Sequence, residues 1–278
     1  MEDPATAAAR LTGQPVTRTR RVSGSLTEAV LEGGDVVMVK RGHGPNAVAA
    51  EAAGLRWLAE PGTVPVPRVR GDDDEWLVLD RVETGRPSLA AAEALGRGLA
   101  ALHAAGAPAF GAAPPGGPAE AWIGLAPMST TTGTDWPTWY AEQRVLPYVR
   151  RAVDDGTLDR AEAAVIEQAC ERLPTSAEPP ARLHGDLWNG NVLWAPDGAW
   201  LIDPAAHGGH RETDLAMLHL FGCPQLDRLL DAYQEVTPLA EGWAGRIGAH
   251  QLFPLLVHTV LFGRSYAGQA VAAARAIR

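Results

Sequence analysis

The stretch that decides the fold is LHGDLWNGNVLWAPDGAWLIDP, which runs from Leu183 to Pro204. It places Asn191 five residues after Asp186, and another aspartate, Asp203, comes just before its end. Transfer of a phosphoryl group needs a carboxylate that faces the acceptor hydroxyl and oxygen ligands for Mg²⁺. Asp186 suits the first role, while Asn191 and Asp203 offer a neutral and an anionic oxygen to a hard cation. The stretch therefore predicts a phosphoryl-transfer site.

The local structure expected for this stretch brings these groups together. Two short apolar runs, 191–194 and 199–202, are separated by the turn sequence PDG, which is typical of a β-hairpin. Its open end would hold Asn191 and Asp203 side by side, with Asp186 on the loop before it. Asp and Asn also favour turns, so each residue taken alone has an alternative role as an ordinary turn former. The grouping favours a site, because two of the only three Asn in the chain lie in this loop.

Lys40 is the single lysine among 24 basic residues. That usage indicates a place where arginine will not serve, such as a crowded phosphate pocket that accepts a compact ammonium more readily than a planar guanidinium. Lys40 follows the apolar run 35–39, which is typical of a buried strand. A helix is expected over 47–60, from which Glu51 would pair with Lys40 and hold it toward the phosphates of a nucleotide. The alternative is a surface lysine and a solvated glutamate.

Two strands joined by a small-residue turn, Ser23-Gly24-Ser25, are expected between residues 18 and 31. Backbone N–H groups in such a turn can approach phosphates closely. The turn has a single glycine, and by itself a plain hairpin turn is the better interpretation. Its position just before the strand that carries the lysine favours binding of phosphate.

Length and composition agree with a two-lobed molecule. A chain of 278 residues exceeds the usual size of a single domain, so two lobes that share a cleft are expected. Residues 1–82 are predicted as strands plus one helix, and residues 83–278 as a mainly helical lobe. The apolar run 252–262 is too short to span a bilayer and predicts a core helix. The loop 107–118, rich in Pro and Gly, is a candidate border of the substrate site.

Charge and cysteine usage exclude several functions. The net charge of −9 argues against a nucleic-acid groove, because phosphate backbones need clustered cations. Two distant cysteines give no disulfide framework, and no charged-then-apolar signal opens the chain, so a cytoplasmic protein without membrane partners is expected. His207 and His210 are three residues apart, but no cysteine partner or HExxH pattern accompanies them, which argues against zinc.

The order of these features resembles the protein-kinase-like superfamily. LHGDLWNGNVLW together with LIDPAAHGGHRETDLAM is similar to the fructosamine kinase (ketosamine 3-kinase) family, and weaker similarity extends over most of the chain. The resemblance implies an α+β bilobal fold with a small antiparallel-sheet N-lobe, residues 1–82, and a mainly helical C-lobe, residues 83–278. It implies that Asp186 is the proton acceptor, that Asn191 and Asp203 bind Mg²⁺, and that Lys40 contacts ATP.

Further roles come from the same resemblance. The backbone of Arg81, Val82 and Glu83, after a strand expected at 76–79, is predicted to hold the adenine. A helix is expected to open within 208–217, with Thr213 or Asp214 able to cap it, and Asp214 is expected to brace the catalytic loop. The remaining predicted roles are a second structural brace at His184 and tentative substrate contacts at Trp188, His207, His210 and Arg211.

Trp188 bears on the substrate class. Protein kinases that modify Ser or Thr usually have a basic residue two positions after the catalytic Asp, where this chain has Trp188. A tryptophan offers a flat apolar face for a sugar ring or alkyl chain and one N–H donor, although a packed core tryptophan is the alternative. A small-molecule kinase is therefore expected, with a sugar adduct on a protein lysine also open as its substrate.

The implied reaction is transfer of the γ-phosphoryl group of ATP, with Mg²⁺, to a sugar hydroxyl of an amine-linked ketosugar. Deglycation repair is the expected role, and the expected state is a monomer or weak homodimer. The chain departs from the family at Ala206-His207, where an aromatic residue is frequent, and in a phosphate loop with less glycine. The alternatives are a kinase of the same fold for an aminoglycoside, a choline-like alcohol or a thiosugar, and a catalytically silent nucleotide-binding module.

Overall fold

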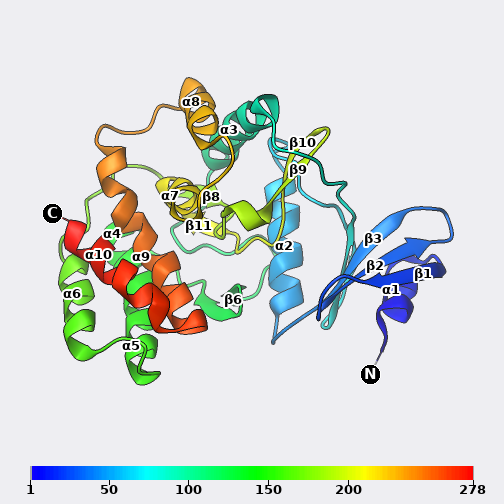
Figure 1. The fold of residues 1–278 in the computed structure, drawn as a ribbon, viewed down its shortest axis with the longest axis horizontal. Helices are drawn as coiled ribbons and strands as arrows, with labels where there is room; N and C mark the ends of the chain where they lie inside the picture. Colours follow the sequence, from blue (N-terminus) through cyan, green and yellow to red (C-terminus); the bar gives the residue numbers. More distant parts are fainter. Residues whose placement is uncertain (1, 278) are drawn as a thin grey trace.

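The computed structural model describes residues 2–277, which form two lobes (Figure 1). The N-lobe is built on one antiparallel sheet of five strands, in the order β1-β2-β3-β5-β4. Of its central strands, β3 buries alternate side chains and β5 buries nearly all of its side chains, as the apolar runs in the sequence predict. The strands are β1 Val16–Arg21, β2 Leu26–Leu31, β3 Val36–Arg41, β4 Val69–Asp72 and β5 Trp76–Asp80.

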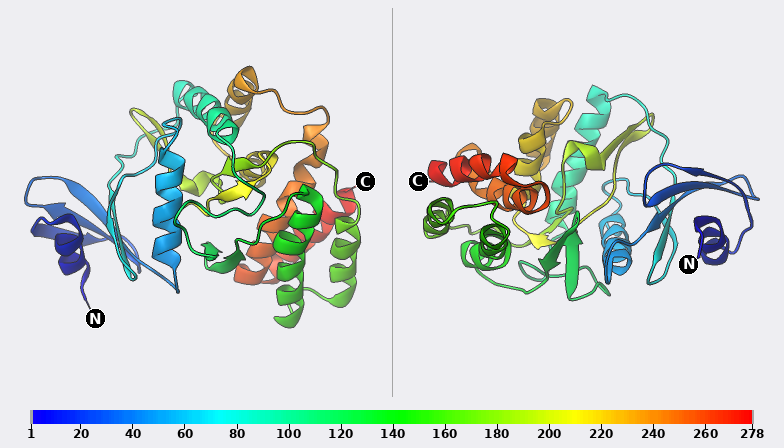
Figure 2. Two further views of the ribbon diagram at one scale, coloured as in Figure 1. Left: turned by 180° about the vertical axis from the view of Figure 1, so that it is seen from behind. Right: turned by 60° about the horizontal axis from the view of Figure 1, so that its bottom comes forward.

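The N-lobe has two helices where the sequence led us to expect one. The helix that was missed, α1 (Pro4–Thr12), packs Ala7 and Ala8 against the sheet. Figure 2 shows this helix beside the sheet from two further directions. Its signals are standard ones: Asp3 caps the first turn, proline opens the helix, and Gly13 ends it with φ +69°. Our prediction overlooked them because the segment has few large apolar residues.

The second helix, α2 (Ala47–Ala59), connects the two lobes. Val48, Ala52 and Leu55 pack on strand β5, which places this face of the helix on the sheet. At its other end, Trp57 and Leu58 belong to a core cluster of the C-lobe. Helix α2 therefore stands between the sheet and the C-lobe (Figure 1) and can transmit the position of one to the other.

The C-lobe is mainly helical, with three two-stranded ribbons inserted among the helices. Its core consists of two clusters of buried apolar residues, and α3 and α8 pack together over one of them. The helices are α3 Leu89–Ala104, α4 Trp136–Tyr140, α5 Leu146–Asp154, α6 Arg160–Cys170, α7 Glu212–Phe221, α8 Leu226–Val236, α9 Trp243–Phe262 and α10 Ala267–Ala276. The paired strands are β6 Glu120–Ile123 with β7 Ala126–Ser129, β8 Ala181–Leu183 with β11 His207–Gly209, and β9 Val192–Ala195 with β10 Gly198–Leu201.

The α+β bilobal fold class is confirmed, and the hairpin expected from the PDG turn is β9–β10. Two details differ. Residues 207–209 form strand β11, so the helix expected within 208–217 begins only at Glu212. The apolar run 252–262 is the second half of α9, a longer helix that continues through Pro254. Within residues 2–277, no helix combines the length and the apolar character needed to cross a membrane.

Candidate active site

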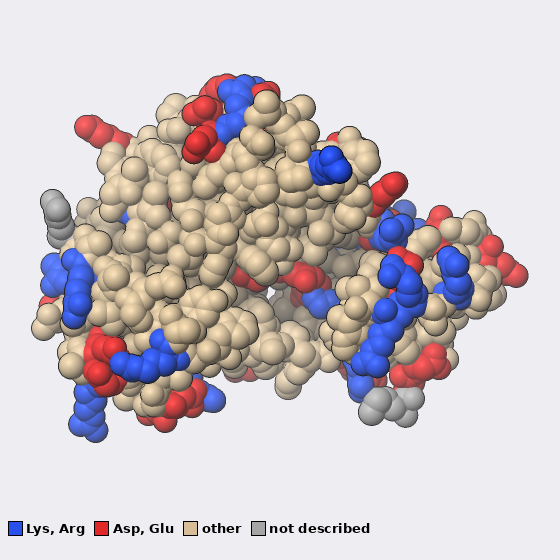
Figure 3. Space-filling view, viewed as in Figure 1, with Lys and Arg blue, Asp and Glu red and all other residues tan. Residues whose placement is uncertain are grey.

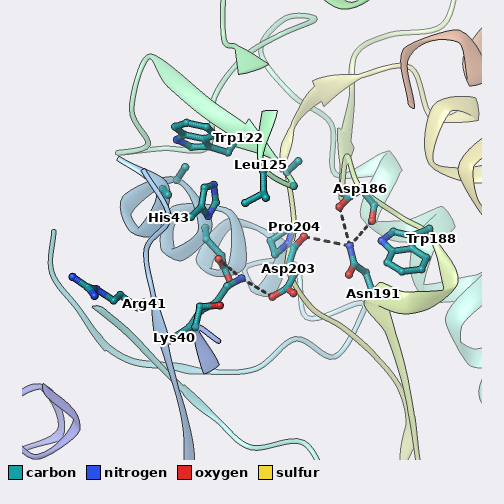
Figure 4. A pocket seen from close by; sticks show the side chains of 16 residues that line it. Lys40, Arg41, His43, Trp122, Leu125, Asp186, Trp188, Asn191, Asp203 and Pro204 are labelled. Carbon is teal, nitrogen blue, oxygen red and sulfur yellow. Dashed lines mark hydrogen bonds and ion pairs between the residues drawn. The ribbon is translucent and has the colours of Figure 1, made fainter. Parts of the chain in front are cut away.

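The cleft brings together the side chains that the sequence analysis singled out (Figure 4). Lys40, at the end of β3, places Nζ 2.7 Å from Glu51 Oε2 and 2.9 Å from Asp203 Oδ1. Asp203 belongs to the C-lobe, so this ion pair joins the lobes. Lys40, Glu51, Asp186, Asn191 and Asp203 all line one pocket of about 330 Å³. Figure 3 shows the corresponding hollow, with acidic and basic atoms meeting at its floor.

The loop that carries Asp186 has a backbone that only glycine allows. Gly185 has φ +82°, and a Cβ at this position would lie 2.1 Å from the carbonyl oxygen of Ala205. Asn191 holds the loop from within, because its Nδ2 donates to the Asp186 carbonyl oxygen at 2.8 Å and to Asp186 Oδ2 at 3.1 Å. His184 Nε2 donates to the carbonyl oxygen of Ile202 at 3.0 Å, which ties the loop to the end of β10.

Asp203 occupies an unusual backbone conformation. Its φ is +52°, a region that residues other than glycine enter rarely and mainly where the surrounding structure compels it. The side chain stays 47% exposed while it contacts Lys40, so it faces the cleft and not the core. The strained turn therefore aims a carboxylate into the cleft directly after β10.

A buried network supports the catalytic loop from below. Asp214, on α7, accepts hydrogen bonds from the backbone N–H groups of His184 at 2.8 Å and Gly185 at 2.9 Å. His103 Nε2 lies 3.2 Å from Asp214 Oδ2, and Tyr233 Oη lies 2.8 Å from His103 Nδ1. Asp214 makes no capping bond to α7, so the capping role considered from the sequence is wrong for this residue. Its carboxylate is already committed to the loop.

The electrostatics of the site are unbalanced toward negative charge. The pKa of Asp186 is raised to about 7, mainly by burial; the hydrogen bond from Asn191 opposes this shift and the nearby Asp203 carboxylate adds to it. Burial by itself would lower the pKa of Lys40, but the carboxylates of Glu51 and Asp203 outweigh it and raise that pKa. Lys40 therefore stays charged, and the cleft can accept a further cation.

A second pocket of about 440 Å³ continues from the first toward the N-lobe sheet. The two pockets share Ser25, Lys40 and Asp203, so they are parts of one cleft. Apolar side chains from both lobes face each other across it. They are Met38 and Leu79 from the sheet and Leu193 and Ile202 from the region of the β9–β10 hairpin. This is a slot for a flat apolar group.

The structure distributes the predicted nucleotide residues unevenly around this slot. Ser23 and Ser25 line it, and Gly24 stands between them in the β1–β2 turn. Arg81 and Val82 also line it, but the Arg81 backbone N–H already donates to the carbonyl oxygen of Val36 at 3.1 Å.

Glu83, the third residue predicted to hold the adenine, does not line the slot but lines a neighbouring pocket together with Pro196 and Trp200. Arg81 and Val82 line both pockets. Of these three residues, Arg81 has its backbone N–H already bonded to the sheet.

Trp188 is the one tentative substrate residue that reaches the cleft. It lines the pocket around Asp186 and is 39% exposed, so it is not a packed core tryptophan. His207 and His210 are buried and line neither pocket. His207 Nδ1 donates to the carbonyl oxygen of Ala205 at 2.8 Å, and Arg211 Nε pairs with Glu178 at 2.6 Å. The fold uses these three side chains for internal contacts.

His210 also belongs to a buried group with Glu212 and His250, whose ligand-type atoms lie within 4.8 Å of one another. Both oxygens of Glu212 accept hydrogen bonds from Arg246, at 2.5 and 2.9 Å. Ser176 Oγ lies 2.8 Å from His210 Nε2. A guanidinium already neutralises the carboxylate, so the cluster fits an internal ion pair that anchors the start of α7.

One wall of the acceptor pocket was missed from the sequence. The tip of the β6–β7 hairpin contributes Trp122, Gly124 and Leu125, whereas no residue of the loop 107–118 lines either pocket. Trp122 Nε1 donates to the carbonyl oxygen of Pro45 at 2.8 Å, and its ring meets the edge of His43 at 4.9 Å between centroids. We call this contact between the lobes the Trp122 clasp. The sequence signal for this hairpin was Gly124, which lies between two short runs that alternate apolar and polar residues.

The fold and the site define a phosphotransferase of the protein-kinase-like class. At the level of fold, the chain is similar to an aminoglycoside phosphotransferase solved with ADP and hygromycin B, with a TM-score of 0.64, 16% identity and 98% of each chain covered. A family model described as fructosamine kinase matches residues 5–277. The chain belongs to the fructosamine kinase family, and it is a kinase.

Individual relatives agree. A probable ketoamine kinase of Thermus thermophilus is 37% identical over 235 residues, which cover 84% of this chain and 83% of the relative. A probable ketoamine kinase of Escherichia coli is 35% identical over 77% of this chain and 74% of its own. The crystal structure of a candidate fructosamine-3-kinase from Thermobifida fusca has a TM-score of 0.91 and 48% identity, with 98% of this chain and 97% of that chain covered.

Proposed function

We propose that this kinase transfers the γ-phosphoryl group of ATP to a sugar hydroxyl of a ketosamine, in the service of deglycation repair. The observation that carries the proposal is the meeting of Lys40 with Asp203 at 2.9 Å, beside Asp186 in the same pocket. The ammonium of Lys40, from the N-lobe, and the carboxylates of Asp186 and Asp203, from the C-lobe, face one cavity of about 330 Å³. The ketosamine class is supported by the similarity to probable ketoamine kinases.

The division of labour follows the lobes. We assign nucleotide binding to residues 1–82 and catalysis and acceptor binding to residues 83–278. The adenine would enter the slot between Leu79 and Leu193, and the phosphates would extend past Ser25 toward Lys40. Glu51 holds Lys40 in this position, because its Oε2 accepts a hydrogen bond of 2.7 Å from the ammonium.

The residues present fit Mg²⁺. Asn191 spends its amide nitrogen on Asp186, which leaves its carbonyl oxygen as a neutral ligand, and Asp203 supplies an anionic one. Burial and the neighbouring Asp203 carboxylate both raise the pKa of Asp186, so a bound cation would relieve part of the cost of its negative charge. When bound, the metal neutralises charge on the phosphate oxygens during transfer.

Asp186 is the group that meets the acceptor. With its carbonyl oxygen and Oδ2 held by Asn191, the carboxylate is oriented before substrate arrives. In a loose transition state it aligns the hydroxyl and takes its proton late, so it need not be a strong base. Asp214 contributes indirectly, since it fixes the backbone of His184 and Gly185.

The test is a panel of acceptors assayed with MgATP. We expect fructosyl-lysine and ribulosyl-lysine to be phosphorylated far faster than an aminoglycoside, choline or a thiosugar. Asp186→Ala should reduce turnover by about 10³-fold or more with nucleotide affinity largely intact, because the carboxylate acts on the acceptor. Equal turnover of Asp186→Ala and the parent would remove Asp186 from this role, and a preference for a different acceptor would refute the ketosamine assignment.

A further inference from the structure

Aromatic side chains continue from the acceptor pocket along the surface of the C-lobe. Trp188 lies next to Phe221 at the end of α7, with 6.0 Å between ring centroids. Phe221 lies 4.7 Å from the ring of His258 on α9. His258 in turn lies 5.3 Å from Phe262 and 5.0 Å from Tyr266. We call these five side chains the aromatic strip.

The strip is open to solvent at both ends. Trp188 is 39% exposed and Phe262 is 63% exposed. Leu125, also 63% exposed, stands at the tip of the β6–β7 hairpin, which rests on α9: a Cβ on Gly124 would lie 3.6 Å from Leu261 Cδ1. Of the six exposed large apolar residues among those described, Leu125 and Trp188 line the pocket around Asp186, and Phe262 lies at the other end of the strip from Trp188. Such gathering on a soluble fold marks a binding surface more often than chance exposure does.

The strip is also uncharged. Burial lowers the pKa of His258, so its ring is neutral near pH 7, and its Nδ1 donates to the carbonyl oxygen of Pro254 at 2.7 Å. Figure 3 shows the middle of the C-lobe surface beside the cleft almost free of the colours that mark charged residues, which appear at the far end and along the top of this lobe and on the N-lobe. An apolar partner is therefore a better match for this surface than a charged one.

We propose that the aromatic strip binds the peptide that carries the ketosamine, so that the preferred substrate is a glycated lysine flanked by apolar residues. This inference rests on the proposed function. Trp188 belongs both to the pocket around Asp186 and to the strip, so the two surfaces are continuous. With the sugar hydroxyl at Asp186, the amine end of the substrate must leave the pocket past its rim.

Dimensions and chemistry favour a peptide over a free amino acid. The successive ring centroids from Trp188 to Phe262 are 6.0, 4.7 and 5.3 Å apart, and an extended peptide advances by about 3.3 Å per residue, so a segment of up to about five residues can follow these rings. A sugar adduct of a free amine would reach only the first rings. The secondary ammonium of a ketosamine can also lie over the face of Trp188, since tryptophan is the best aromatic partner for a cation.

The experiment compares two ketosamines that share the same sugar. One is fructosyl-ethanolamine, and the other is an end-capped tripeptide, Leu-Lys-Leu, fructosylated on its lysine. We expect the parent enzyme to have the higher kcat/KM for the tripeptide. Phe262→Ala should lower that value by about five- to tenfold, through KM, and leave fructosyl-ethanolamine within about twofold of the parent. Phe262→Tyr keeps the ring and should keep the preference.

The control is Val236→Ala, which shortens another exposed apolar side chain, at the end of α8 and outside both pockets. It should leave kcat/KM unchanged for both ketosamines. Equal effects of Phe262→Ala on both ketosamines, or no effect on the tripeptide, would overturn the inference. So would a change from dimer to monomer in sedimentation of Phe262→Ala, since the strip would then join two copies of the chain. If the parent phosphorylates neither ketosamine but does phosphorylate another acceptor, the proposed function fails first and this inference with it.

Discussion

Asp186 shows how a single buried carboxylate links stability to catalysis. Its pKa is raised from the ordinary 3.8 to about 7, with burial as the largest cause. A carboxyl group whose pKa is raised on folding stabilises the protein only while it stays protonated, so stability is lost as pH rises from about 4 to about 7. The loop is therefore held against an electrostatic cost that a bound cation would offset.

Asp186→Asn should raise the thermal stability of the nucleotide-free protein above pH 7, by up to about 4 kcal/mol if each unit of pKa is worth about 1.4 kcal/mol. The neutral amide avoids the cost of a buried negative charge. Thermal unfolding measured from pH 4 to pH 8 should show that the difference in stability between Asp186→Asn and the parent becomes smaller as pH falls. A difference that does not change with pH would contradict the ionisation of Asp186 as its cause.

Asp203 differs from Asp186 because its side chain is largely exposed and its proposed role is to bind Mg²⁺. Asp203→Ala should reduce the gain in ATP affinity that Mg²⁺ provides by about tenfold or more, since one of two proposed ligands is lost. Affinity for ATP without metal should hold or improve, because a carboxylate near the phosphates is removed. Titration calorimetry with and without Mg²⁺ measures both. Asp74→Ala, in the exposed β4–β5 turn, is the matched control.

At the scale of elements, α2 sets the distance between the lobes. Gly54 faces the segment after Asp203: a Cβ on Gly54 would lie 3.2 Å from Ala206 Cβ and 3.3 Å from Pro204 Cγ. The helix that carries Glu51 therefore rests on the segment that follows Asp203. A small residue at this crossing is what permits the Lys40 to Asp203 contact.

Gly54→Val should destabilise the protein by about 1–3 kcal/mol and also weaken MgATP binding, since the larger side chain pushes α2 away from Pro204. Unfolding and nucleotide titration report the two effects. Gly245→Val is the control, because Gly245 is helical, exposed and has open space around it. An unchanged MgATP affinity in Gly54→Val would show that the crossing does not position the site.

The Trp122 clasp is another contact between elements of different lobes. Trp122→Phe removes the N–H that donates to Pro45 and keeps the edge contact with His43, so it should raise KM for the acceptor modestly. Trp122→Ala removes both contacts and should raise KM by about tenfold, because the wall formed by Leu125 loses its support. Trp200→Phe removes another indole donor, that to Asp197, and should leave KM unchanged. A fall in kcat alone would count against the clasp.

For the whole molecule, separate cores make the ligand an important part of stability. The sheet packs with α1 and α2 in two small clusters, while the C-lobe holds the two large ones. Across the front of the cleft the lobes meet through the Lys40–Asp203 ion pair and the Trp122 clasp. A nucleotide that contacts both lobes would add further contacts across the front of the cleft.

MgATP at about 100 times its Kd should therefore stabilise the folded protein by about 2.7 kcal/mol, which raises Tm by about 5–10 °C for a chain of this size. Differential scanning calorimetry measures the shift. Lys40→Met should lose most of it, since among residues 2–277 Lys40 is the one cation that lines both pockets of the cleft. A full shift in Lys40→Met would place the nucleotide elsewhere.

Much of the site was readable because its spacing is local. Asp186, Asn191 and Asp203 lie within one loop and one hairpin, and short-range turn chemistry holds them near each other in almost any packing. Lys40 was found for a different reason, its chemical singularity in a chain of arginines. Glu51 followed from helical spacing next to that strand.

Residues whose roles depend on distant partners were not readable in this way. His207, His210 and Arg211 sit in a polar motif, yet tertiary packing turns them toward Ala205, Ser176 and Glu178. Trp122 and Leu125 reach the cleft only because a short hairpin, far from the motif in the chain, folds against α9 and the N-lobe.

The amino-acid order alone thus determined the chemistry on offer: a carboxylate loop, two oxygen ligands and one ammonium, each on a predictable element. Tertiary structure alone decided which surface lies beside them, namely the clasp, the aromatic strip and the crossing of α2 at Gly54. The physical reason is the separation along the chain over which each kind of interaction acts. Hydrogen bonding and periodicity act over a few residues, whereas burial and shape complementarity join segments separated by a hundred or more.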